Sequence, residues 1–130
     1  MRSIRIGARV AVVLAAACFL ALPAAAPPAS DAELRVAIVG TWAEAGGCGI
    51  DEAVFNADGT FLSGYVGYQV SGTYTIMNGE LLGKHDKMQI GDGPDGVMLP
   101  VLVRFDSGKL VLFDPSRGDN GEGGGLIKCK

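Results

Sequence analysis

The chain has 130 residues, with 11 basic and 14 acidic side chains and a formal net charge of −3. A chain of this length is long enough for a single domain with one core. Its acidic balance argues against a nucleic-acid partner, because phosphates attract clusters of lysine and arginine. We interpret the acidity as a source of solubility.

Residues 1–26 have the three parts of a secretory signal peptide. Three arginines precede the apolar run 10–22, and alanines end the segment. The run is shorter than the roughly 20 residues of a membrane-spanning helix, so we predict no membrane span. We expect cleavage after Ala26, with Ala24 an equally compatible position, and export to the periplasm or beyond the cell. Loss of the three arginines would change the net charge from −3 to −6. Acylation of Cys18, as in a lipoprotein, stays open as the alternative.

Two cysteines remain after the predicted signal peptide, Cys48 and Cys129. In an oxidising compartment two cysteines most simply pair with each other. A metal or redox centre would favour closer spacing, such as Cys-x-x-Cys, which the chain lacks. The sequence therefore predicts a Cys48–Cys129 disulfide, no metal site and no cofactor.

Residues 27–39 are predicted to form a leader and a short helix. Ser30 and Glu33 have the spacing of a capping box, in which each side chain accepts a hydrogen bond from the other residue's backbone. Gly40 is a natural stop for this helix. Its apolar face is predicted to consist of Leu34, Ala37 and Ile38.

Residues 40–130 show short apolar runs between turn signals, the pattern of an all-β domain. Residues 70–76 alternate between apolar and polar, and Asn78-Gly79 is a strong hairpin signal. Further strands are expected from about 41, at 53–55 and 60–68, from 80, and at 97–105, 110–113 and 126–130. About eight strands joined in sequence favour an antiparallel up-and-down barrel, which leaves no exposed edge. The predicted fold is thus this barrel with one short N-terminal helix; a two-sheet sandwich is the alternative.

The alternating pattern also predicts the core. Pro100 has no N–H for a strand ladder, so a bulge or an edge is expected within 97–105. The side chains expected to be largely buried are Trp42, Phe55, Phe61, Tyr74, Ile76, Leu102, Phe105 and Leu112.

The tripeptide Gly40-Thr41-Trp42 follows the predicted helix and opens the first strand. Together with Asp58-Gly59-Thr60-Phe61 and Gly72-Thr73-Tyr74, it resembles the small secreted bacterial lipocalin-like, or calycin-type, barrels. The resemblance implies that Trp42 fills the closed end of the barrel beneath a basic side chain of a late strand. Lys128 or Arg104 could supply this side chain through a cation–π contact. True lipocalins have an arginine after the last strand, which is absent here.

The same resemblance implies a non-enzymatic protein that binds a small apolar ligand. The segments least explained by packing are the tyrosines Tyr65 and Tyr68 and the loops 91–96 and 114–125, so we predict the ligand near them. The chain also resembles periplasmic inhibitors of metalloproteases, which implies an inhibitor of a secreted hydrolase as one alternative, with the leader at 27–30 as its contact segment. A structural envelope protein is the other.

Two weaker patterns are interpreted as structural. His85 stands beside Asp86, but the chain has no Gly-x-Ser-x-Gly nucleophile motif, so we expect an exposed polar histidine and no enzyme. Carboxylates also recur in glycine-rich loops, where calcium ligands are found, but their spacing fits no EF-hand. We interpret them as solvated turn residues: Asp92, Asp95, Asp114, Asp119 and Glu122.

Overall fold

A computed structural model describes residues 29–65, 67–122 and 124–130. The predicted signal peptide at 1–26, Cys18 and the start of the leader lie outside the described residues.

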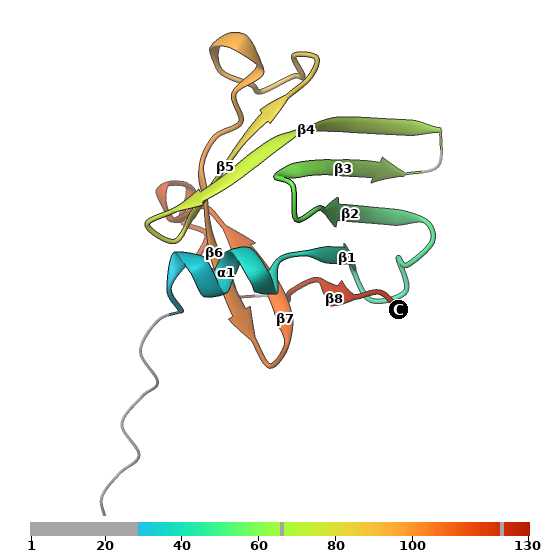
Figure 1. The fold of residues 1–130 in the computed structure, drawn as a ribbon, viewed down its shortest axis with the longest axis vertical. Helices are drawn as coiled ribbons and strands as arrows, with labels where there is room; N and C mark the ends of the chain where they lie inside the picture. The colour runs from blue at the N-terminus through green and yellow to red at the C-terminus, as the bar shows by residue number, and fades with distance from the viewer. Residues whose placement is uncertain (1–28, 66, 123) are drawn as a thin grey trace, which may run out of the picture.

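The described residues form a nearly closed, eight-stranded antiparallel barrel with one helix at its N-terminal side (Figure 1). From β1 to β7 the strands pair consecutively in sequence and β8 pairs with β1, which gives the order β7-β6-β5-β4-β3-β2-β1-β8. This single sheet confirms the predicted all-β fold and excludes the sandwich. The elements are α1 Asp31–Ala37, β1 Gly40–Ala43, β2 Asp51–Phe55, β3 Thr60–Tyr65, β4 Tyr68–Met77, β5 Glu80–His85, β6 Val101–Asp106, β7 Lys109–Phe113 and β8 Ile127–Lys128, with 3-10 turns η1 Pro94–Gly96 and η2 Pro115–Arg117.

Few backbone pairings hold the barrel together at three seams, and one of these is β1–β8, where only Trp42 with Lys128 and Ala43 with Ile127 are in register. Between β7 and the segment before β8, Leu110 and Leu126 exchange two backbone hydrogen bonds of 2.9 and 2.8 Å. Between β5 and β6 only two residue pairs are in register, with a further bridge from Lys84 to Val97. The barrel therefore closes through a few bonds at each seam.

Several strand boundaries differ from the prediction, and two of the differences have a clear backbone cause. β3 ends at Tyr65 and β4 begins at Tyr68, so the predicted continuous strand 60–68 is wrong. Gly67 has a φ of 90°, which favours a chain reversal. β6 begins only at Val101, so Pro100 precedes the strand; a residue without an N–H fits there better than inside a ladder.

The predicted start of the helix and the predicted hairpin turn at Asn78-Gly79 are both confirmed. Glu33 N donates to Ser30 Oγ and Ser30 N donates to a Glu33 carboxylate oxygen, which completes the capping box. Asn78 and Gly79 have φ values of 53° and 74°, as a two-residue hairpin turn requires. Leu34 and Ile38 of the predicted helix face are buried, while Ala37 is exposed.

The inner face of the sheet is packed with side chains. Of the predicted core, the buried members are Trp42, Phe55, Phe61, Tyr74 and Ile76. Leu102, Phe105 and Leu112 are partly buried. Leu102 alternates with the buried Val103 and pairs with Phe113, so it lies on the opposite face of β6. Phe105 and Leu112 still pack against the core.

Asp31 connects the helix to the β4–β5 hairpin. Its carboxylate accepts the backbone N–H groups of Asn78 and Gly79, both at 2.8 Å. These bonds, with that from Gly79 the stronger influence, hold the pKa of Asp31 below its ordinary value of 3.8. The ionised carboxylate therefore stabilises the docked helix.

We expect Asp31→Asn to lower the free energy of unfolding at pH 7. The pKa of Asp31 is lower in the folded than in the unfolded chain, so its contribution is complete above about pH 4 and disappears as the pH falls through the folded-state pKa. The difference between the unfolding free energies of wild type and variant, measured in urea titrations, should accordingly shrink as the pH falls below about 4. Asp95→Asn, which neutralises an exposed carboxylate on another loop, serves as the control; a difference that does not change with pH would contradict this role.

Candidate binding site at the open end of the barrel

The connections between strands differ at the two ends of the barrel. Successive antiparallel strands alternate in direction, so every second connection emerges at the same end. The short turns at 56–59, 78–79 and 107–108 share one end with α1, here called the closed end. The longer connections at 44–50, 86–100 and 114–126 share the other, here called the open end. Long loops held by a rigid scaffold are where barrels carry binding groups.

Trp42 fills the closed end. Its side chain is 2% exposed, its Nε1 donates to Ile38 O at 2.8 Å, and Lys128 Nζ lies 5.5 Å from the ring centroid. Arg104, the other predicted cation, lies over Phe113 instead. A Cβ added to Gly40 would lie 2.7 Å from Lys128 Cε, so the glycine leaves space for the lysine stem. The structure thus brings Gly40, Trp42 and Lys128 together.

A hollow of about 600 Å³ opens beside the β1–β2 connection. Its apolar walls include Trp42, Ala43, Ala53 and Leu126, and its polar groups are Glu44, Asp51, Glu52 and Ser63. A neighbouring hollow of about 560 Å³ shares Glu44 and Leu126 with the first and adds Lys109, Leu110 and Leu112. Apolar walls beneath carboxylates suit a molecule with an apolar body and a cationic or hydrogen-bond-donating group.

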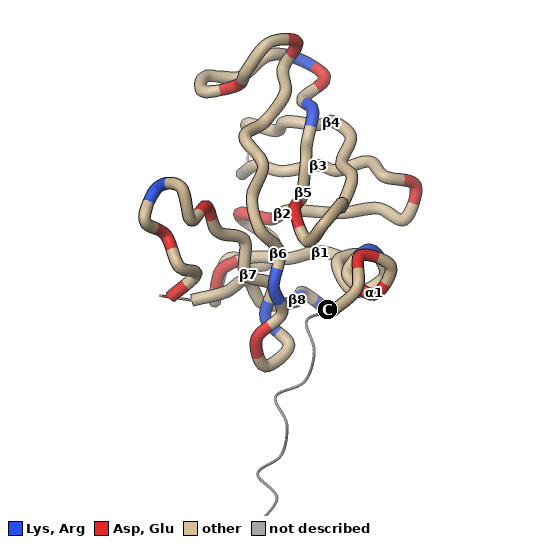
Figure 2. Tube along the Cα trace, turned by 90° about the vertical axis from the view of Figure 1, so that its left-hand side faces the viewer, with Lys and Arg blue, Asp and Glu red and all other residues tan. Residues whose placement is uncertain are grey.

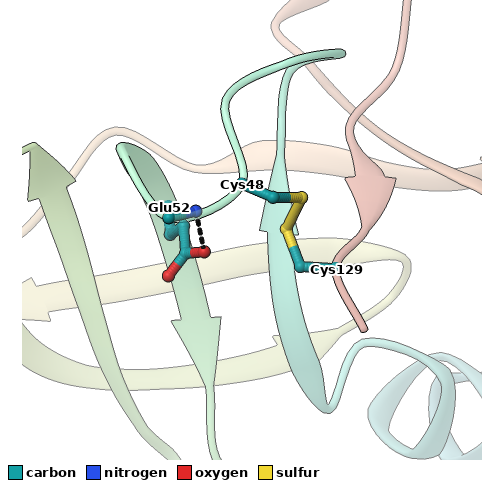
Figure 3. Close-up of a disulfide and its surroundings, with 4 residues drawn as sticks. Cys48, Glu52 and Cys129 are labelled. Carbon is teal, nitrogen blue, oxygen red and sulfur yellow. Dashed lines mark hydrogen bonds between the residues drawn. A yellow bond between two sulfur atoms is a disulfide. The ribbon is translucent and has the colours of Figure 1, made fainter.

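A disulfide fixes the loop that borders this hollow. Cys48 in the β1–β2 connection bonds to Cys129 after β8, with the two Cα atoms 5.7 Å apart (Figure 3). Glu52 accepts the N–H of Gly49 on the other side of the loop (Figure 3), and Cys129 N donates to Thr41 O at 2.8 Å. The predicted pairing is confirmed, and it holds one wall of the hollow in place.

His85 is not the exposed histidine that the sequence suggested. Its side chain is 11% exposed, and its Nδ1 lies 2.8–2.9 Å from both carboxylate oxygens of Asp92. Asp86, its neighbour in sequence, instead accepts a hydrogen bond from Ser71 Oγ, because adjacent residues point to opposite faces of a strand. The N–H of Gln89 and, to a lesser degree, His85 hold the pKa of Asp92 below its ordinary value.

The two tyrosines predicted to bind a ligand lie at the end of the β3–β4 hairpin. Tyr65 and Tyr68 pair in register, and the Tyr68 hydroxyl donates to Gln89 Oε1. This bond places Tyr68 against the 86–96 loop, which contains the predicted 91–96 segment. The predicted loop 114–125 contributes Gly124 and Gly125 to the second hollow. A role of these segments in ligand binding stays a prediction.

The sequence pattern did not identify the residues around the first hollow as candidate binding residues. Glu44, Asp51 and Ser63 are separated along the chain and have no shared motif. The available signal was Gly46-Gly47-Cys48-Gly49, a glycine-rich loop held by a predicted disulfide. Among the described residues, no group of three or more His, Cys, Asp or Glu side chains is placed to hold a metal ion. No helix in the described ranges is both long and apolar enough to cross a membrane.

Comparison of the chain with protein-family models, with curated proteins and with solved structures finds no match in any of the three. The likeness to lipocalin-like barrels therefore depends on the Gly40-Thr41-Trp42 motif and on the architecture: a nearly closed eight-stranded antiparallel barrel with a short helix before its first strand, as far as the described residues show.

Proposed function

We propose that the protein is an exported, non-enzymatic, lipocalin-like binding protein that holds a small amphipathic molecule at the open end of its barrel. The hollow of about 600 Å³ beside the disulfide-linked loop carries this proposal. Its size falls within the roughly 300–1,000 Å³ of small-molecule sites, and barrel mouths are a common place for them. The fixed loop reduces the ordering cost of binding.

The ligand lies at the mouth and not inside the barrel. Phe55, Phe61, Tyr74 and Ile76 are buried on the inner face, and an eight-stranded barrel has room for little beyond its own side chains. The residues around the mouth also change the expected ligand class, because Glu44 and Asp51 favour a cationic or hydrogen-bond-donating group on an otherwise apolar molecule.

Export is supported by two observations. The Cys48–Cys129 disulfide is typical of oxidising compartments outside the cytoplasm. The arginines, apolar run and alanines of residues 1–26 have the order of a signal peptide. The periplasm or the extracellular space is the compartment that we infer.

The proposal is tested with dodecylamine as the probe and dodecanoate as its counterpart of opposite charge, both kept below their aggregation concentrations. Trp42 is the single tryptophan and borders the hollow, so its fluorescence should report binding. We expect the amine to bind more tightly, and Asp51→Asn to weaken that binding by about tenfold, the size of one charge-assisted hydrogen bond.

Asp95→Asn is the control, because it neutralises an exposed carboxylate outside the hollow. Native mass spectrometry with dodecylamine checks the stoichiometry independently of fluorescence. Equal effects of Asp51→Asn and Asp95→Asn, or no retained amine, would contradict the proposal and favour the hydrolase inhibitor or the structural protein.

A further inference from the structure

The two hollows at the open end adjoin each other. Both are lined by Glu44, Ala45 and Leu126. From these shared residues the first hollow extends to Asp51, and the second extends in the other direction to Lys109. We call the two hollows together the mouth groove. One elongated molecule can therefore occupy both hollows at once.

The mouth groove crosses four neighbouring strands. β2 pairs with β1, β1 pairs with β8, and Leu126 just before β8 pairs with Leu110 of β7. Adjacent strands lie about 4.8 Å apart, so Asp51 at the start of β2 and Lys109 at the start of β7 are three spacings apart, roughly 14 Å across the sheet. A ligand that reaches both residues must therefore have an extended body.

Two carboxylates of the first hollow have no partner within the protein. Among the described residues, the side chains of Glu44 and Asp51 form no hydrogen bond and no ion pair, and both residues are exposed. Glu52, the third acidic residue of this hollow, accepts the N–H of Gly49. Glu44 and Asp51 therefore keep their full capacity to accept hydrogen bonds from a cationic group.

A basic side chain lies at the other end of the mouth groove. Lys109 lines the second hollow and forms no ion pair in the described part of the chain. Asp106, which pairs with it across the β6–β7 hairpin, is bonded to Arg104 Nε at 2.7 Å, and Lys128 lies over Trp42 and lines neither hollow. In Figure 2 acidic positions lie beside the β2 label and basic positions near the β7 and β8 labels. The ammonium group of Lys109 therefore favours an anionic group on the ligand.

Apolar side chains lie between the two charged ends. Leu126 lines both hollows, and Leu110 and Leu112 line the second. Leu112 and Leu126 pack against the core, and Leu110 belongs to it, so these side chains form a supported surface. An alkyl chain that covers them removes apolar area from water, which favours binding.

We infer that the ligand of the mouth groove is an elongated zwitterion, with a cationic group at Glu44 and Asp51 and an anionic group at Lys109. An apolar chain over Leu126 connects the two groups. This inference rests on the proposed function and adds Lys109 as the residue that selects the second charge of the ligand. The opposite charges also fix the direction in which the ligand lies, because the reversed orientation would bring like charges together.

Two probes of matched length test the second charge. 12-Aminododecanoate carries an amine and a carboxylate, whereas 1,12-diaminododecane carries two amines; all four groups are ionised at pH 7. Titration calorimetry measures their affinities, with Trp42 fluorescence as a second readout. We expect the wild type to bind the amino acid about tenfold more tightly than the diamine, because the second amine would face Lys109. Lys109→Glu should reverse this preference, and Lys109→Met should abolish it without reversing it.

Lys87→Glu is the matched control, because it makes the same change of charge at an exposed lysine that lines neither hollow. It should leave the preference of the wild type unchanged, and melting temperatures close to that of the wild type should show that the variants fold. Equal affinities of the wild type for the two probes would overturn the inference. A preference that responds equally to Lys109→Glu and Lys87→Glu would also overturn it.

Dodecylamine, measured with the same variants, separates this inference from the proposed function. Binding of dodecylamine that depends on Asp51, together with a probe preference that Lys109→Glu leaves unchanged, would retain the proposed function and overturn the zwitterion. Absence of binding by all three compounds would overturn both. Reversal of the preference by Lys109→Glu, with dodecylamine binding that this variant does not weaken, is the result that supports both.

Discussion

Replacing Cys48 and Cys129 together by serine should lower the free energy of unfolding by about 4.5 kcal/mol, because their disulfide closes a long loop in the unfolded chain. The sequence separation is 81 residues. The expected loss is a large share of the roughly 5–15 kcal/mol that stabilises an ordinary domain. The bond also connects the end of β8, only two residues long, to the β1–β2 connection. Urea titration under non-reducing conditions measures the change.

The wild-type protein in a reducing buffer is the control for this prediction. Its unfolding midpoint should move to that of the double serine variant, since both lack the cross-link. A loss below about 1 kcal/mol would mean that the unfolded chain is already restricted, or that the strands alone hold the seam near β8. The double variant should also weaken dodecylamine binding, because the wall of the hollow is then no longer fixed.

Trp42→Ala should lower the free energy of unfolding by about 3–5 kcal/mol, as for other large-to-small changes at buried aromatic residues. The indole is 2% exposed and packs on Phe105, with ring centroids 5.7 Å apart. Truncation leaves a cavity and also removes the donor to the Ile38 carbonyl. Denaturant titration followed by circular dichroism measures the loss, because the variant has no tryptophan fluorescence.

Lys128→Met is the companion variant, since it retains an apolar stem over the ring but removes the charge. It should cost about 0.5–1 kcal/mol, the usual size of an exposed cation–π contact. A loss below about 1 kcal/mol for Trp42→Ala itself would contradict its role in filling the closed end.

Features that depend on neighbours in sequence were predictable. The Ser30–Glu33 capping box, the Asn78-Gly79 hairpin and the alternation through residues 70–76 each follow from backbone geometry over a few residues. The Cys48–Cys129 pair was predictable for another reason: two cysteines leave only one intramolecular pairing. The barrel followed from the number of strands and the shortness of their connections, because closure avoids exposed edges.

The sites depended on contacts that no local pattern encodes. His85 is partnered by Asp92 and not by Asp86. Adjacent side chains in extended backbone point to opposite faces, so Asp86 contacts Ser71 instead, and the connection between β5 and β6 supplies the carboxylate of Asp92. The hollow combines Glu44, Ser63 and Leu126, which come from separate connections and strands. The amino-acid sequence by itself determined the helix, the strands and the disulfide, whose causes are local spacing and cysteine number. Only the tertiary structure decided which side chains meet at the open end, because barrel closure and strand register place residues distant in sequence side by side.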